Sequence, residues 1–137
     1  MARIICIDYG GKRTGLAVTD PMKLIATGLA TIPSGELIPF LKNYFLKEPV
    51  EKILIGEPTN LDHSDTHATP LVKKVLLQLK KEFPQYPIET VDERYSSKMA
   101  KTAMLEMGMK KKQRREKENV DIIAATILLQ EYLNTIV

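Results

Sequence analysis

The chain has 137 residues, of which 44% are hydrophobic, and this predicts one domain over residues 1–137 with a buried core. A single cysteine, Cys6, excludes an intrachain disulfide, and no window of 18 apolar residues predicts a membrane span, so we expect a soluble, cytoplasmic protein. The net charge is +3, but the run 110–118 carries six positive and two negative charges, which leaves the remainder about neutral. This concentrated basic patch predicts a localised anionic partner.

Three strands are predicted at the start of the chain. Residues 3–9 form a nearly continuous apolar run that ends at an acid and two glycines, which is typical of a strand buried on both faces. Residues 14–19 and 24–32 are rich in β-forming types and are separated by the turn signal Asp20-Pro21. Their short spacing predicts an antiparallel meander.

Helices and strands alternate after residue 34. A helix is predicted after Ser34-Gly35, a buried strand at 52–56, a second helix capped by Thr69, and a fifth strand at 87–91. The apolar positions with helical spacing are Leu37, Leu41, Tyr44 and Phe45 in the first helix, and Val72, Val75, Leu76, Leu79 and Phe83 in the second.

The last third of the chain predicts a short helix from Ser96 to Gly108, a loop over the basic run 109–118, and a final helix capped by Asn119. A meander followed by alternating helices and strands predicts an α/β fold with a mixed five-stranded sheet flanked by helices.

Four carboxylates fall at similar places in this scheme. Asp8 ends the first strand, Glu57 the fourth and Glu93 the fifth, while Asp121 opens the last helix. Strand ends at one edge of an α/β sheet converge, and carboxylates gathered there repel one another unless a cation binds. All-oxygen ligands suit Mg²⁺ or Mn²⁺, and two such ions would suit phosphodiester hydrolysis.

Each acid also has a structural interpretation. Asp8 could cap the glycine turn, Glu93 could pair with Arg94, and the helix dipole would favour Asp121 in a first turn. For Glu57, which precedes a proline, both interpretations stay open.

Two loops carry further candidate residues. Gly10, Lys12 and Arg13 could approach and neutralise a phosphate, although this pattern alone is weak evidence. His63 and His67 lie in a loop with two aspartates, but without cysteines or helical spacing they make a poor zinc site.

Four of these segments, in this order, resemble the YqgF (RuvX) family. The segments are Asp8 to Val18, Ile55 to Pro58, the triplet Asp92-Glu93-Arg94 followed by Ser96, and Val120-Asp121. The family comprises small RNase H-like proteins described as Holliday junction resolvases and as nucleases that mature the small-subunit ribosomal RNA precursor. The resemblance covers essentially the whole chain.

The resemblance implies an RNase H-like sheet of order 3-2-1-4-5 and places the catalytic, metal-binding acids at Asp8, Glu93 and Asp121. One departure is Glu57, because the family commonly has an apolar residue there. Related resolvases carry an acid at the end of the fourth strand, so Glu57 is a possible additional metal ligand.

We therefore expect a metal-dependent endonuclease of structured nucleic acid that processes the 5′ end of pre-16S rRNA. Its expected partners are nucleic acid, as pre-rRNA or branched DNA, with ribosomal particles as possible further partners. Its expected substrate contacts are Gly10, Lys12, Arg13, Arg94, Ser96, Lys111, Arg114 and Arg115. Three alternatives are a Holliday junction resolvase, a non-catalytic RNA- or ribosome-binding module, and an actin-like ATP-handling protein. Length opposes the last, which needs two such domains. A monomer or a weak homodimer is expected, and the residues do not separate RNA from DNA substrates.

Overall fold

The computed structural model describes residues 2–57, 69–92 and 117–136. Five strands form one mixed sheet in the order β3-β2-β1-β4-β5, which confirms the expected order. β1 pairs antiparallel with β2 and parallel with β4, β2 pairs antiparallel with β3, and β4 pairs parallel with β5. The strands are β1 (Arg3–Tyr9), β2 (Arg13–Thr19), β3 (Ala26–Pro33), β4 (Val50–Glu57) and β5 (Ile88–Asp92).

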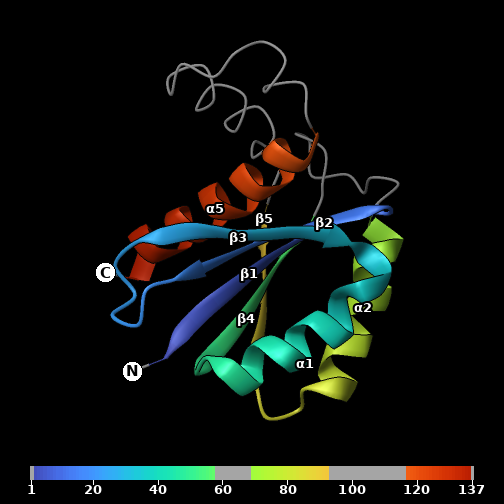
Figure 1. Ribbon diagram of the computed structural model, residues 1–137, viewed down its shortest axis with the longest axis horizontal. Helices are drawn as coiled ribbons and strands as arrows, with labels where there is room; N and C mark the ends of the chain where they lie inside the picture. The colour runs from blue at the N-terminus through green and yellow to red at the C-terminus, as the bar shows by residue number, and fades with distance from the viewer. Residues whose placement is uncertain (1, 58–68, 93–116, 137) are drawn as a thin grey trace.

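Helices cover both faces of the sheet, as Figure 1 shows. A single 3₁₀ turn, η1 (Ser34–Glu36), leads into α1 (Leu37–Lys47), which lies on the same face as α2 (Thr69–Glu82). The long helix α5 (Lys117–Ile136) crosses the opposite face and contacts β1, β2 and β3. The first strand is therefore buried on both sides, as its unbroken apolar run predicted.

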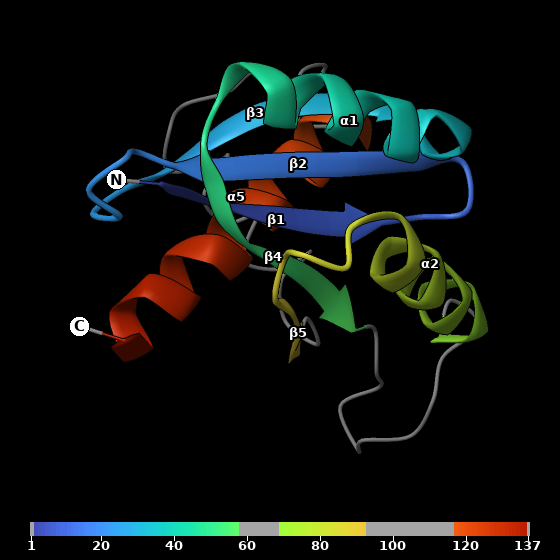
Figure 2. The same cartoon turned by 90° about the horizontal axis from the view of Figure 1, so that it is seen from below.

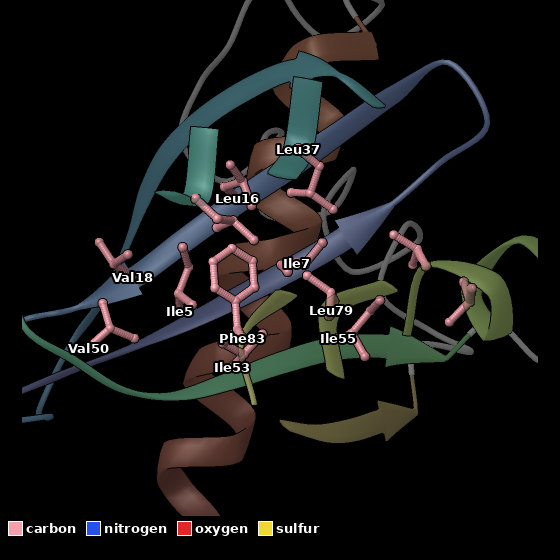
Figure 3. Packing of buried hydrophobic residues seen from close by; sticks show 13 residues of the cluster. Ile5, Ile7, Leu16, Val18, Leu37, Val50, Ile53, Ile55, Leu79 and Phe83 are labelled. Atoms are coloured by element: carbon pink, nitrogen blue, oxygen red, sulfur yellow. The ribbon is translucent and has the colours of Figure 1, made fainter. Parts of the chain in front are cut away.

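Alternation along β1 divides the core into two layers. Ile5 and Ile7 point into the layer formed with α1 and α2, where Leu37 and Leu79 are also fully buried (Figure 3). Ile4 and Cys6 point into the α5 layer, and Cys6 is fully buried as a small apolar residue. Each large side chain buried in this way contributes about 1.5–3 kcal/mol.

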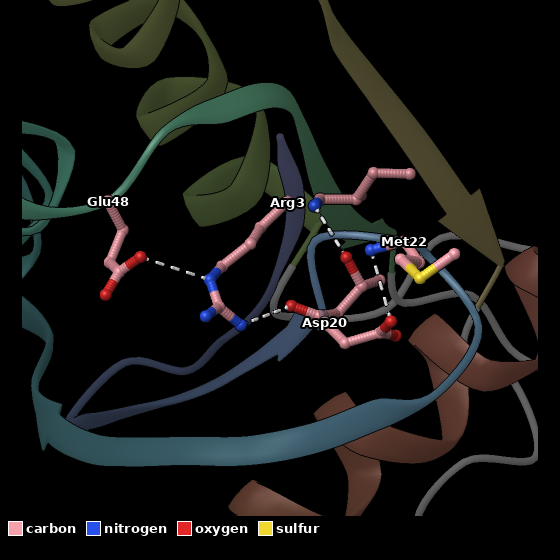
Figure 4. A network of polar contacts seen from close by, with 6 residues as sticks. Arg3, Asp20, Met22 and Glu48 are labelled. Atoms are coloured by element: carbon pink, nitrogen blue, oxygen red, sulfur yellow. Dashed lines mark hydrogen bonds and ion pairs between the residues drawn. The ribbon is translucent and has the colours of Figure 1, made fainter. Parts of the chain in front are cut away.

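The third strand begins at Ala26, two residues later than predicted, because Asp20 organises the preceding turn. The Asp20 carboxylate accepts hydrogen bonds from the backbone amides of Met22 (3.1 Å), Leu24 (2.8 Å) and Ile25 (2.8 Å), the first of which is drawn in Figure 4. Lys23 adopts the left-handed conformation with φ 60°. These bonds hold residues that favour strands by type in a turn instead.

Two helix starts also differ from the prediction. α5 begins at Lys117, so the last two residues of the predicted basic loop are helical and Asn119 is inside the helix instead of capping it. Similarly, Thr69 is the first residue of α2 and not the residue before it. Helix boundaries shift by one or two residues because end residues satisfy their hydrogen bonds in several ways.

The predicted helix 96–108 and the loop as far as residue 116 lie outside the described residues. Among the helices that the structure describes, none is long and apolar enough to cross a membrane.

Candidate active site

Asp8 lies next to last in β1, beside Gly15 of β2. It is half-buried, and it shares the sheet face of Ile4 and Cys6 because alternate residues of a strand point the same way. This is the face that α5 covers. The sequence prediction of an acid at the carboxyl end of a central strand is therefore confirmed in its position.

Asp121 belongs to α5, which lies on the same face as Asp8. The next residue, Ile122, touches β3 so closely that a Cβ on Gly28 would stand 2.5 Å from its Cγ2 atom. Further along the helix, the Gln130 side-chain oxygen accepts a hydrogen bond from the Ala26 amide at 3.0 Å. α5 therefore runs antiparallel to β3, and its first half lies toward the end of the sheet where β1 ends.

The helix start changes the interpretation of Asp121. Because α5 begins at Lys117, Asp121 is its fifth residue and does not lie in the first turn, contrary to expectation. The favourable effect of the helix dipole on an acid falls off within the first turn. A favourable interaction with the helix dipole is therefore a weak explanation for an acid at position 121.

The parallel strands β1, β4 and β5 end at one edge of the sheet. Ile7 lies beside Ile55, and Glu57 is in register with Asp92, the last residue of β5. Glu57 thus ends the strand next to Asp8, as predicted, but the structure does not describe its side chain. Such an edge is where α/β sheets bind ligands.

The connection between β1 and β2 is a tight turn at this same edge. A Cβ on Gly10 would stand 2.5 Å from the Arg13 carbonyl oxygen, so the turn itself requires glycine there. The exposed Gly11 is different, because among the described atoms a Cβ there would meet only Leu71 Cδ1, at 3.7 Å. The role of Gly10 is thus to form the turn, and the exposed Lys12 projects from it.

Ser34 holds the β1–β2 turn in place through hydrogen bonds. Its hydroxyl donates to the Gly10 carbonyl at 2.5 Å and lies 2.8 Å from the Thr14 hydroxyl, while its amide donates to the Lys12 carbonyl at 3.0 Å. Both Ser34 and Thr14 are buried. The turn that carries Lys12 and Arg13 is therefore held in one conformation before any ligand binds.

Sequence reasoning missed Ser34 and Gly28 as residues of the site. Ser34 stood out only as a helix-start signal, and Gly28 only as a glycine within a β-rich run. An isolated glycine inside a strand can signal close approach of another backbone, and this was the available clue to Gly28.

Several predicted site residues lie outside the described part of the chain: Glu93, Arg94, Ser96, Lys111, Arg114 and Arg115, together with His63 and His67. Among the described side chains, no group of three His, Cys, Asp or Glu residues could hold a metal ion. Of the predicted carboxylate ligands, only Asp8 has a described side chain.

A pocket of about 320 Å³ lies elsewhere, between the carboxyl ends of α1 and α2, where Phe45, Leu46, Phe83 and Tyr86 line it. Both helix ends are at the opposite edge of the sheet from Asp8, since α1 starts beside the Gly10 turn and runs away from it. The pocket is therefore remote from Asp8.

Comparison with known proteins identifies the family. The family model described as "RuvX: Holliday junction resolvase" matches residues 2–135. The chain belongs to the RuvX family. A family member from Flavobacterium psychrophilum, named "Putative pre-16S rRNA nuclease", is 53% identical over 97% of both chains, and a relative of the same name from Bacteroides thetaiotaomicron is 49% identical over 98% of both.

The fold of this RuvX-family chain is also found in a solved structure. A structure titled "T. thermophilus RuvC in complex with Holliday junction substrate" matches with a TM-score of 0.57 over 98% of this chain and 95% of that one. The identity is 14%, so the likeness establishes the RNase H-like fold alone. The family match and the names of these relatives, and not the structural likeness, make the chain a nuclease, a hydrolase of ester bonds whose substrate is nucleic acid.

Proposed function

We propose that this protein is a divalent-metal-dependent endonuclease that trims the 5′ end of pre-16S rRNA, with Asp8, Glu93 and Asp121 as its catalytic carboxylates. The observation that carries the proposal is the position of Asp8. It is a half-buried acid at the carboxyl end of the central strand, on the face where α5 brings the backbone of Asp121 toward the same edge. Several relatives with about half of their residues identical carry the name of a pre-16S rRNA nuclease.

The proposed residues are of the type that a hard cation prefers as ligands. Asp8, Glu93 and Asp121 would offer carboxylate oxygens, and Glu57 would add a further one from the neighbouring strand. Bound there, Mg²⁺ or Mn²⁺ would lower the pKa of the attacking water and stabilise charge on the leaving oxygen. Carboxylates gathered at one edge would repel one another, and a bound cation would offset that repulsion.

The chain's own residues would position the substrate. Lys12 projects from the turn that Ser34 fixes, so its charge can meet a phosphate without reordering the backbone. Arg13, Arg94 and Ser96 would hold neighbouring phosphates. The basic residues Lys111, Arg114 and Arg115 would add affinity that does not depend on sequence.

Cleavage of a four-way DNA junction is the second candidate function, because the matching family model carries the resolvase description. We favour RNA because the relatives at the highest identity that we compared carry the rRNA name.

The decisive experiment compares a pre-16S rRNA fragment and a four-way DNA junction side by side, with Mg²⁺, Mn²⁺ or EDTA. We expect RNA cleavage that EDTA abolishes and that Asp8→Asn reduces by at least about 10³-fold. Asp20→Asn is the matched control, since Asp20 lies at the opposite edge of the sheet and should leave cleavage unchanged. Cleavage of the junction alone would favour the resolvase function. Equal activity of Asp8→Asn and wild type would refute the metal site, and RNA binding without cleavage would indicate a binding module.

A further inference from the structure

The solvent face of α2 carries four lysines in two pairs, Lys73 and Lys74 near its start and Lys80 and Lys81 near its end. All four are exposed. At 100° per residue they fall within an arc of roughly 120° opposite the buried residues Val72, Val75 and Leu79. They therefore form one cationic ridge along the helix, which we call the α2 ridge.

Nothing in the described part of the chain neutralises the α2 ridge. The only acid in α2 is Glu82, and its carboxylate pairs with Lys42 of α1 at 3.1 Å. No ion pair of the four lysines occurs among the described residues, whereas Lys23, Lys42 and Lys52 all have carboxylate partners. Helices whose charges serve only solubility usually mix both signs, so a ridge of one sign is unusual.

The ridge begins beside the candidate active site. α2 starts next to the β1–β2 turn, where Leu71 Cδ1 lies 3.7 Å from the position a Cβ on Gly11 would take. Figure 2 shows the same arrangement, with α2 beside the arrowhead end of β1. Lys73 and Lys74 follow within one helical turn of Leu71, so the ridge continues the positive charge of Lys12 away from the edge.

The spacing suits a nucleic-acid backbone. Lys73 and Lys80 are seven residues apart, about 10 Å along the helix axis. Double-stranded nucleic acid carries one charge about every 1.7 Å of its axis. A duplex that lies along α2 can therefore place phosphates near both lysine pairs at once. Four lysines that displace counterions would add affinity without reading sequence.

We propose that the α2 ridge binds the phosphate backbone of a substrate arm that extends beyond the scissile bond. This inference rests on the proposed nuclease function, because the activity at the adjoining edge is what makes nucleic acid the favoured occupant. The ridge would raise affinity and take no part in bond cleavage.

Paired variants test the ridge through the salt dependence of binding. Binding is measured on RNA and DNA duplexes of about 30 base pairs in the Asp8→Asn background without divalent metal, so that no cleavage intervenes. Lys73→Gln/Lys74→Gln and Lys80→Gln/Lys81→Gln should each lower the slope of log K against log salt by about 1–2 and weaken binding roughly tenfold at moderate salt. In the Asp8-containing enzyme, both pairs should raise KM and leave kcat unchanged.

Two control variants distinguish binding by the α2 ridge from an effect of net charge and from docking of a protein partner. Lys23→Gln/Lys47→Gln removes the same charge at the opposite edge and should leave the slope unchanged. Leu77, which is 69% exposed between the lysine pairs, should tolerate Leu77→Ser with no loss of nucleic-acid binding.

Three results would overturn the proposal: unchanged slopes in both ridge variants, an equal change in the Lys23 and Lys47 control, or a loss in Leu77→Ser as large as in the lysine variants. The last would indicate an apolar docking face for another protein. Wild-type protein that binds duplex through the ridge but cleaves nothing would instead refute the nuclease function and leave the ridge intact.

Discussion

Gly28 of β3 and Ile122 of α5 touch at a point where no side chain larger than hydrogen fits, since a Cβ on Gly28 would stand 2.5 Å from Ile122 Cγ2. We predict that Gly28→Ala lifts α5 and costs about 1–3 kcal/mol in the free energy of unfolding, as overpacking does. Because Asp121 precedes Ile122, the proposed site should open, and cleavage should fall by about 10–100-fold. Denaturant unfolding and cleavage rates measure both effects.

Removing the opposing side chain tests the cause of this effect. Ile122→Ala added to Gly28→Ala should restore a large part of the lost cleavage, although it gives up apolar contacts of its own. Gly35→Ala is the matched control, because a Cβ at Gly35 would meet no atom of the described residues within 4 Å. A double variant no more active than Gly28→Ala would show that displacement of α5 is not the reason.

Ser34→Ala should loosen the β1–β2 turn. It removes the donor to the Gly10 carbonyl and leaves the buried Thr14 hydroxyl without this partner, which costs about 1–3 kcal/mol. KM for nucleic acid should rise because Lys12 loses its fixed position, and denaturant unfolding together with steady-state kinetics measures the pair of effects. Thr14→Val keeps the bond from Ser34 to Gly10 and should perturb KM less. The same KM for both variants would contradict this role of Ser34.

The turn at Asp20 makes a prediction for pH. The amides of Ile25, Leu24 and Met22 donate to the Asp20 carboxylate and hold its pKa below the ordinary value of 3.8. A lowered folded-state pKa contributes stability that is complete above the ordinary value and is lost as pH falls through the folded value. Wild type should therefore lose more stability between neutral pH and the strongly acidic range than Asp20→Asn, as measured by urea unfolding at each pH. Parallel curves would contradict the prediction.

Tyr132 ties the carboxyl half of α5 to the sheet. Its hydroxyl donates to Glu89 of β5 at 3.0 Å, and the Lys52 ammonium of β4 lies 2.7 Å from it. We predict that Tyr132→Phe costs about 0.5–1.5 kcal/mol in the free energy of unfolding, with the lower end favoured by partial exposure. Tyr86→Phe is the control, because its hydroxyl makes no hydrogen bond within the described part of the chain. Equal effects of the two variants would show that the Tyr132 contact contributes nothing.

At the opposite edge from Asp8, Arg3 shows why that edge is structural. Its guanidinium donates to the Thr19 carbonyl at 2.9 Å and lies 3.4 Å from Glu48, as Figure 4 shows. This pair joins the start of β1 to the end of β2 and to the residue after α1. Arg3 therefore has a carboxylate partner at this edge, whereas none of the four lysines of the α2 ridge forms an ion pair with a described residue.

The sequence by itself determined the local structure and the place of the central acid. Apolar runs and helical spacing predicted the five strands, α1 and α2, because burial on one or two faces leaves a periodic trace in the chain. The run before Asp8 likewise predicted an acid at the end of a central strand. The sheet order came from the family resemblance, since periodicity counts strands but does not pair them.

Only the tertiary structure decided which distant residues meet. Ser34 lies 24 residues from Gly10 and Gly28 lies 94 residues from Ile122, and neither contact has a local pattern that predicts it. The start of β3 was also decided by three hydrogen bonds to Asp20, which outweighed the strand preference of Leu24 and Ile25. Periodicity indicates which face of an element is buried, but it does not indicate which other element covers that face. Only the tertiary structure shows that α5 covers the face of β1 to which Asp8 belongs.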